Sequence, residues 1–200
     1  MRPEQLVLVT GTGTDVGKTW VAAAWLSTLT VTTAARKPVQ SFSPGDRTDA
    51  DVLAAATGEA PETVCPRHRW YEVPMAPPMA ADVLGRPQFT VADLVGEIAW
   101  PSPTVAVGVV EGVGGPRSPI ASDGDGVDLA RALQPDRVVL VADAGLGTIN
   151  AVRLCATALG GWPLTVFLNR FDDGDDLHCR NRDWLRDVAK LQVVTDVAAL

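Results

Sequence analysis

The sequence has no apolar run that approaches the roughly 20 residues a helix needs to span a membrane. Its first apolar run, at residues 6–9, is short and leads directly into a glycine-rich segment. It lacks the cationic start and the cleavage site of a secretory signal. These absences argue against a membrane partner, and we expect the protein to work in the cytoplasm.

Positive charge and cysteine are also scarce. The chain has 17 lysines and arginines against 24 acidic residues, a formal net charge of −7, and no basic block of the kind that binds membranes. A nucleic-acid binder more often has a basic excess, so we expect no nucleic-acid partner. The three cysteines, Cys65, Cys155 and Cys179, are widely spaced and form no Cys-x-x-Cys pair. This pattern is typical of reduced thiols in a cytosolic protein.

Lysine occurs only three times, at Lys18, Lys37 and Lys190. The chain therefore uses arginine wherever a generic surface cation will do. Lysine differs chemically from arginine, because it is a compact point charge on a flexible stem. The few lysines that remain are candidates for specific roles.

Short apolar runs alternate with helical patterns along the 200 residues, a length that fits one domain. We expect strands at residues 6–10, 34–39, 105–110, 138–142 and 164–168, and a short edge strand at 193–194. We expect helices at residues 18–29, 49–57, 90–99, 127–133, 181–190 and from the segment after 143 to about 159. Residues 60–87 are rich in proline and are interpreted as a long loop with one short helix near 79–84.

This alternation predicts an α/β fold with a parallel sheet and helices on both faces. In such sheets the ligand site lies beyond the carboxyl ends of the strands. The residues that directly follow each strand are therefore the candidates for a functional site.

The segment GTGTDVGKT at residues 11–19 follows a strand and opens a helix, as a phosphate-binding loop does. Its glycines let backbone N–H groups converge on phosphate oxygens. Lys18 would reach the β- and γ-phosphates, and the Thr19 hydroxyl would ligate Mg²⁺. The common pattern has its first glycine where Thr12 stands, and Gly11 lies one residue further out. The loop predicts a P-loop enzyme that uses ATP and Mg²⁺.

Three acidic residues outside the phosphate loop are candidates for the metal site. Glu111 comes directly after a buried strand, beside Gly112 and Gly114, and is well placed for a metal. Asp49 and Asp51 lie at the start of a helix, where either could complete a Mg²⁺ shell or cap the helix. The sequence leaves this choice open.

Three further polar residues have candidate roles. Lys37 ends a short strand, where it could neutralise charge that develops on a phosphoryl or carboxylate group. Asn169 ends another strand, and its amide matches the N6/N7 edge of adenine. Asp15 lies inside the phosphate loop, where its carboxylate could approach the metal or the substrate, or face solvent.

Taken together, four segments resemble the ATP-dependent dethiobiotin synthetases. They are residues 9–19 (VTGTGTDVGKT), 37–41 (KPVQS), 110–115 (VEGVGG) and 146–150 (LGTIN). The phosphate loop of that family has the same extra residue before Gly-Lys-Thr, and residues 74–77 (PMAP) resemble its proline-rich substrate-side segment. The resemblance implies a P-loop NTPase-like fold, a single synthetase domain over residues 1–200, and a homodimer.

The resemblance also implies a reaction. 7,8-Diaminononanoate and CO₂, available from bicarbonate, form a carbamate that attacks the γ-phosphate of ATP and gives a carbamic–phosphoric anhydride. The second amine then closes the ureido ring and expels phosphate. The products are dethiobiotin, ADP and phosphate, in the penultimate step of biotin biosynthesis.

Each residue that matches the family's motifs takes an implied role. The catalytic residues would be Thr14, Lys18 and Lys37. The nucleotide would be bound by Gly13, Thr14, Asp15, Val16, Gly17, Lys18, Thr19, Glu111, Gly112, Val113, Gly114 and Asn169. Mg²⁺ would be held by Thr19, Asp49 and Glu111. The diamine would contact Lys37, Ser41, Leu146, Gly147 and Asn150, and the last three belong to a loop that receives the substrate's carboxylate across the dimer interface.

The chain departs from the family after Asn169. A Gly-x-Ile-Pro-type segment commonly helps to hold the base there, whereas residues 191–195 of this chain read LQVVT. The preferred base is therefore left open.

Two other functions use a similar loop. An amidoligase-like P-loop enzyme usually carries a glutamine-hydrolysing domain, for which 200 residues leave no room. A partitioning-type ATPase switch typically has a signature lysine early in the loop, and here no lysine precedes Lys18.

Overall fold

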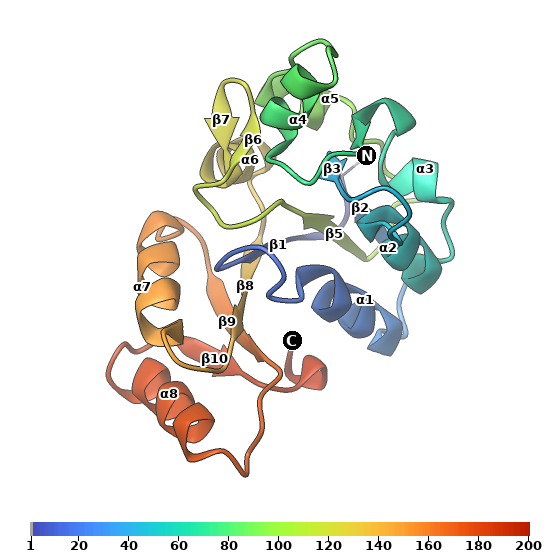
Figure 1. Cartoon of the computed structure of the whole chain (residues 1–200). Helices are drawn as coiled ribbons and strands as arrows, with labels where there is room; N and C mark the ends of the chain where they lie inside the picture. Colours follow the sequence, from blue (N-terminus) through green and yellow to red (C-terminus); the bar gives the residue numbers. More distant parts are fainter. Residues whose placement is uncertain (1) are drawn as a thin grey trace.

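A computed structural model describes residues 2–200, and its centre is a six-stranded sheet (Figure 1). The strands lie in the order β10-β9-β8-β1-β5-β2, and every neighbouring pair is parallel. Their bounds are β1 Gln5–Gly11, β2 Thr33–Arg36, β5 Val107–Glu111, β8 Arg137–Asp143, β9 Leu164–Asn169 and β10 Gln192–Val194. The predicted parallel sheet is confirmed, including its short edge strand.

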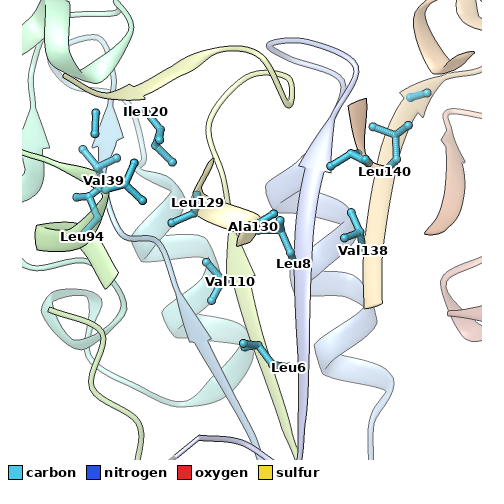
Figure 2. Packing of buried hydrophobic residues seen from close by; sticks show 14 of the residues in the cluster. Leu6, Leu8, Val39, Leu94, Val110, Ile120, Leu129, Ala130, Val138 and Leu140 are labelled. Atoms are coloured by element: carbon cyan, nitrogen blue, oxygen red, sulfur yellow. The ribbon is translucent and has the colours of Figure 1, made fainter. Parts of the chain in front are cut away.

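The sheet separates two buried clusters of apolar side chains. In β1, Leu6 and Leu8 join one cluster, whereas Val7 and Val9 join the other. Successive side chains of a strand point to opposite faces, so one strand serves both clusters. Figure 2 shows side chains of the first cluster, with Leu8 among them.

Helices cover both faces of the sheet. Those that matter here are α1 Lys18–Thr28, α2 Asp49–Thr57, α5 Val91–Gly96, α6 Gly126–Leu133, α7 Thr148–Ala158 and α8 Asp176–Asp187. Leu26 of α1 and Leu53 of α2 belong to one cluster, and Leu129 of α6 and Val152 of α7 belong to the other. Because both faces are covered, the central strands are mostly apolar and carry no alternating polar pattern.

The turn from β1 into α1 requires a glycine at position 17. Gly17 has a φ of 91°, in the left-handed region. A Cβ atom added there would lie 2.1 Å from Asn169 Nδ2. The sharp turn and the close approach of β9 therefore both depend on the missing side chain.

Several predicted boundaries are wrong; the helix expected at residues 90–99, for example, spans only Val91–Gly96. The second strand was expected to reach residue 39 but ends at Arg36, because the next backbone N–H, that of Lys37, bonds the Val64 carbonyl outside the sheet at 2.8 Å. The last helix begins at Asp176 and not at residue 181. The side chain of Asp175 accepts hydrogen bonds from the N–H groups of Leu177 and His178, which caps the helix at that earlier point.

The expected long loop at residues 60–87 contains more structure than the sequence suggested. It holds α3 (Pro61–Val64), a 3₁₀ turn (Arg67–Arg69), β4 (Trp70–Tyr71) and α4 (Pro77–Val83). Two of its prolines begin helices, where a missing N–H costs no hydrogen bond. Strand β4 pairs in parallel with β3 (Gln40–Ser41), which brings this segment to the carboxyl edge of the main sheet.

Smaller elements complete the fold. An unexpected antiparallel pair, β6 (Pro119–Ala121) and β7 (Gly124–Asp125), follows the glycine-rich turn after β5. A final 3₁₀ turn spans Val197–Ala199. Over residues 2–200, no helix has the length and apolarity that a membrane crossing requires.

Candidate active site

A cavity of about 730 Å³ lies at the carboxyl ends of β1, β2 and β5. The expected residues that line it are Thr14, Asp15, Gly17, Lys18, Thr19, Lys37, Ser41, Asp49, Glu111, Val113 and Gly114. The proline-rich segment at residues 74–77 forms another part of its wall. The fold therefore brings together side chains that are up to about a hundred positions apart in the sequence, at the edge where parallel sheets bind ligands.

The phosphate loop closes on itself in the structure. Lys18 Nζ donates a hydrogen bond of 2.8 Å to the carbonyl of Gly13, so the lysine bends back over the loop. Burial and the nearby charge of Lys37 lower the pKa of Lys18 below its ordinary value. An anion in the loop would favour the protonated lysine, which links phosphate binding to the charge of this side chain.

Lys37 lies between two carboxylates. Its Nζ is 2.7 Å from Asp49 Oδ2, 2.7 Å from Glu111 Oε1 and 2.9 Å from the carbonyl oxygen of Gly112. Burial by itself would lower the pKa of Lys37, but the two carboxylates outweigh burial and raise it. Lys37 is therefore a fully buried cation held at the carboxyl edge of the sheet.

The two carboxylates differ in their surroundings. Glu111 is completely buried, and this burial raises its pKa even though Lys37 opposes the shift. Asp49 is partly open to solvent. Burial opposes its ionisation too, but Lys37 and the Thr19 hydroxyl hold the pKa of Asp49 below its ordinary value. Asp49 is therefore the more firmly ionised of the two groups.

The choice between Asp49 and Asp51 is clear from their hydrogen bonds. Asp51 Oδ2 accepts from the backbone N–H and the hydroxyl of Thr48, at 3.0 and 2.8 Å, and completes the capping box of α2. Asp49 Oδ1 instead accepts a 2.7 Å bond from the Thr19 hydroxyl. Asp51 belongs to the helix cap, and Asp49 belongs to the cavity.

Three oxygen-bearing side chains meet at one point of the cavity. The Thr19 hydroxyl lies within hydrogen-bond distance of both Asp49 Oδ1 (2.7 Å) and Glu111 Oε1 (2.9 Å). The other carboxylate oxygen of Glu111 is buried and has no hydrogen-bond partner among residues 2–200. Mg²⁺ takes hydroxyl and carboxylate oxygens in proteins, and water and phosphate oxygens complete its shell. The donor set and the unpartnered Glu111 oxygen fit a Mg²⁺ ion.

Asn169 reaches the phosphate loop from β9. Its Nδ2 donates a 3.0 Å hydrogen bond to the carbonyl of Val16, and the side chain is buried. Asn169 and Val16 do not line the cavity themselves, so this amide supports the loop from behind.

The loop at residues 146–150 lies apart from the cavity. Leu146, Gly147 and Asn150 are absent from its lining. Leu146 is 91% exposed, and Gly147, with a φ of 94°, precedes the first turn of α7. One chain alone therefore does not bring these three expected substrate residues to the phosphate loop.

Sequence reasoning missed several residues of the cavity. Gln40 Oε1 accepts a 3.0 Å hydrogen bond from the N–H of Ala50 and so ties β3 to the start of α2. Ser41 was expected here, but its hydrogen bond was not: its hydroxyl donates to the carbonyl of Met75 at 2.6 Å, which fixes the proline-rich wall. Arg170 also lines the cavity, and the one signal in the sequence that could have revealed it is its position directly after Asn169.

Comparisons with known proteins agree with this geometry. A family profile described as an AAA domain matches residues 5–197. The chain is 39% identical over 179 residues to an ATP-dependent dethiobiotin synthetase of Anaeromyxobacter sp., a match that covers 85% of this chain and 78% of that protein. It is 37% identical to an ATP-dependent dethiobiotin synthetase of Rhodococcus jostii, over 79% of this chain and 74% of that protein.

A solved structure supports the fold. A plasmid partition protein from Borrelia burgdorferi superposes with a TM-score of 0.55 over 98% of this chain and 90% of that one. Sequence identity is 11%, so this likeness concerns the P-loop NTPase-like fold alone.

Proposed function

This chain belongs to the family of ATP-dependent dethiobiotin synthetases, and we propose from that premise that it makes dethiobiotin from 7,8-diaminononanoate, CO₂ and ATP. The observation that carries the proposal is the cavity in which the phosphate loop, the buried Lys37 and the carboxylates of Asp49 and Glu111 meet. Phosphoryl transfer requires positioning and charge neutralisation more than a covalent nucleophile, and these groups supply both.

ATP would enter with its triphosphate in the loop at residues 13–19. Lys18 would exchange the Gly13 carbonyl for the β- and γ-phosphate oxygens, and Thr14 would contact the phosphates beside it. Backbone N–H groups of the loop and the start of α1 add a fixed positive potential. The turn at residues 112–114 would border the phosphates from the β5 side.

Thr19, Asp49 and Glu111 would hold Mg²⁺, which when bound neutralises charge on the β- and γ-phosphates. Lys37 is the compact cation beside this group, and we assign it to the carbamate and to the phosphoryl group in transfer. Ser41 lines the same cavity and would contact the diamine.

The chemistry balances without any residue of the protein forming a bond to the substrate. One amine of the diamine adds to CO₂, loses a proton and becomes a carbamate. A carbamate oxygen bonds to the γ-phosphorus as the bond to ADP breaks. The second amine then attacks the carbamate carbon, and phosphate leaves with that oxygen. The protein's share is to orient these groups and to stabilise negative charge.

The distal end of the substrate would be bound by a second copy of the chain. The exposure of Leu146 (91%) and of Leu154 (65%) on the neighbouring α7 supports a contact surface there. In a homodimer the loop of one protomer, with Gly147 and Asn150, would receive the carboxylate tail of the diamine held by its partner. We place this single-domain synthetase in the cytoplasm.

Asn169 would read the adenine base. Its Nδ2 is engaged by the Val16 carbonyl, so its Oδ1 is the atom suited to accept a hydrogen bond from the N6 amino group. Because N4 of cytosine presents a similar donor, the nucleotide preference needs a direct test.

The test is release of nucleoside diphosphate by the purified protein with Mg²⁺, in the presence and absence of diaminononanoate and of bicarbonate, with ATP and then with GTP and CTP. We expect turnover only when both small substrates are present. Brisk turnover without the diamine, or none with it, would contradict the proposal.

A further inference from the structure

Three carbonyl groups of the phosphate loop are each held by a different side chain. Lys18 Nζ holds that of Gly13 at 2.8 Å, and Asn169 Nδ2 holds that of Val16 at 3.0 Å. The third is the carbonyl of Asp15, which accepts a 2.9 Å hydrogen bond from the Nη2 group of Arg170. Lys18 and Asn169 have proposed roles toward the nucleotide, whereas Arg170 has none.

The direction of these carbonyls matters for anion binding. A loop can bind phosphate only when its N–H groups point inward, so its carbonyl oxygens must point away from the anion. Asp15 lies at the turn of the loop in the left-handed region, with a φ of 59°. A non-glycine residue is strained in that region, so the conformation needs a partner that holds it.

Arg170 is itself anchored. It follows Asn169 at the end of β9, and its own φ of 54° is also in the left-handed region. Its Nη1 group donates a 2.9 Å hydrogen bond to Asp143 Oδ2, at the end of β8. Asp143 lies opposite Asn169 in the register of the two strands. The guanidinium therefore spans the ends of two central strands and the turn of the phosphate loop.

We propose that Arg170 is a positioning residue for nucleotide binding: it fixes the Asp15 carbonyl outward and so keeps the N–H groups of the loop aimed at the triphosphate. This proposal rests on the proposed use of the loop for a nucleotide. It also gives Asp15 a role through its backbone. When phosphate oxygens attract Lys18 away from Gly13, Arg170 and Asn169 remain to hold the other two carbonyls.

The ion pair between Arg170 and Asp143 is not what makes Arg170 matter for nucleotide binding. Arg170 and Asp143 have side-chain exposures of 58% and 51%, and pairs this exposed contribute little to stability. The effect expected from the loss of Arg170 is on the conformation of the loop, and hence on affinity, with little effect on folding. The loss of affinity should be the same for every base, because Arg170 bonds the backbone carbonyl of Asp15 and not the nucleotide.

The experiment compares Kd values for ATP and for inorganic triphosphate, both with Mg²⁺, by calorimetry. The variants are Arg170→Ala and Arg170→Gly, with Arg180→Ala as control. Arg180 makes a similar exposed ion pair with Asp176 on α8 and does not line the cavity. Arg170→Gly removes the side chain while relieving the left-handed backbone, so it separates loss of binding from loss of stability.

We expect both Arg170 variants to bind ATP and triphosphate about 10-fold more weakly, by the same factor for both ligands, with Arg180→Ala unchanged. The melting temperature of Arg170→Gly should not fall. Unchanged affinities would overturn the inference, and so would a loss confined to ATP, which would make Arg170 a contact to the base. If the wild-type protein binds neither ligand, both the proposed function and the role of Arg170 are wrong. This outcome is distinguishable from failure of the Arg170 inference alone, because it appears in the wild-type protein and does not depend on any variant.

Discussion

Lys37 Nζ lies 2.7 Å from Glu111 Oε1, and the two side chains are 2% and 0% exposed. They come from the ends of the neighbouring strands β2 and β5, so the topology of the sheet creates this contact. Removing one partner of a buried ion pair leaves the other charge uncompensated and commonly costs about 3–5 kcal/mol. Tests of Lys37 and Glu111 must therefore separate loss of chemistry from loss of stability.

Lys37→Ala should abolish dethiobiotin formation and leave nucleotide binding largely intact, because Lys18 and the backbone of the loop remain. Lys37→Arg keeps a cation between the carboxylates and should preserve more stability, yet it should still be at least about 100-fold slower, since a planar guanidinium cannot replace a compact ammonium. Lys190→Ala, at the exposed lysine far along the chain, is the matched control. Full activity of Lys37→Ala would refute the assigned role.

Asp49 and Asp51 provide a paired test of the Mg²⁺ site. Asp49→Asn should raise the Mg²⁺ concentration needed for half-maximal turnover by about 10-fold or more, because a charged ligand is lost. Asp51→Asn weakens the cap of α2 and should lower the free energy of unfolding by about 1 kcal/mol without changing the Mg²⁺ requirement. The measurements are Mg²⁺ titrations of activity and urea unfolding. Equal Mg²⁺ requirements for the two variants would contradict the assignment.

The small number of lysines makes their titration directly observable. Protein labelled with ¹³C at lysine Cε should give three resonances, one for each lysine in the sequence. As the pH rises, Lys18 should lose its proton below the ordinary lysine pKa of 10.5, because burial and Lys37 destabilise its charge. Lys37 should retain its proton above that value, because Asp49 and Glu111 outweigh burial. Lys190→Arg removes the third signal, and the reverse order of the remaining two would contradict the electrostatics described for the site.

Gly17→Ala tests the approach of β9 to the phosphate loop. A Cβ at position 17 would meet Asn169 Nδ2 at 2.1 Å, whereas at Gly58, also in the left-handed region with a φ of 72°, it would meet nothing within 4 Å. Both substitutions carry the same kind of backbone strain. Only Gly17→Ala should weaken ATP binding, by about 10-fold or more, as measured by calorimetry. A similar loss of affinity in Gly58→Ala would show that the effect arises from general destabilisation.

The central parts of the fold and site were predictable because they depend on local patterns. Apolar runs mark the buried strands, and residues 11–19 mark the phosphate loop, so Lys18, Thr19 and Glu111 could be placed at one edge of the sheet. The strand topology then brought Lys37 and Asp49 to the same place, as the resemblance implied.

Other features depend on contacts that no local pattern records. Asp51 meets the Thr48 hydroxyl, whereas Asp49 meets the Thr19 hydroxyl and Lys37, and the sequence does not show which partner each carboxylate takes. The proline-rich stretch at residues 60–87 has no period, yet Trp70 and Tyr71 within it pair with the distant strand β3. The proposed role of Arg170 depends on its bond to a backbone carbonyl 155 residues away, which composition and spacing cannot show.

The most direct test of the proposed reaction is to follow oxygen from bicarbonate to phosphate. In the proposed reaction a carbamate oxygen attacks the γ-phosphorus and departs with phosphate when the ureido ring closes. With ¹⁸O-labelled bicarbonate and diaminononanoate, mass spectrometry should therefore find one labelled oxygen in the phosphate formed with each dethiobiotin. Unlabelled phosphate, released at the same rate with or without the diamine, would mean that water attacks ATP, and the protein would be a simple ATPase.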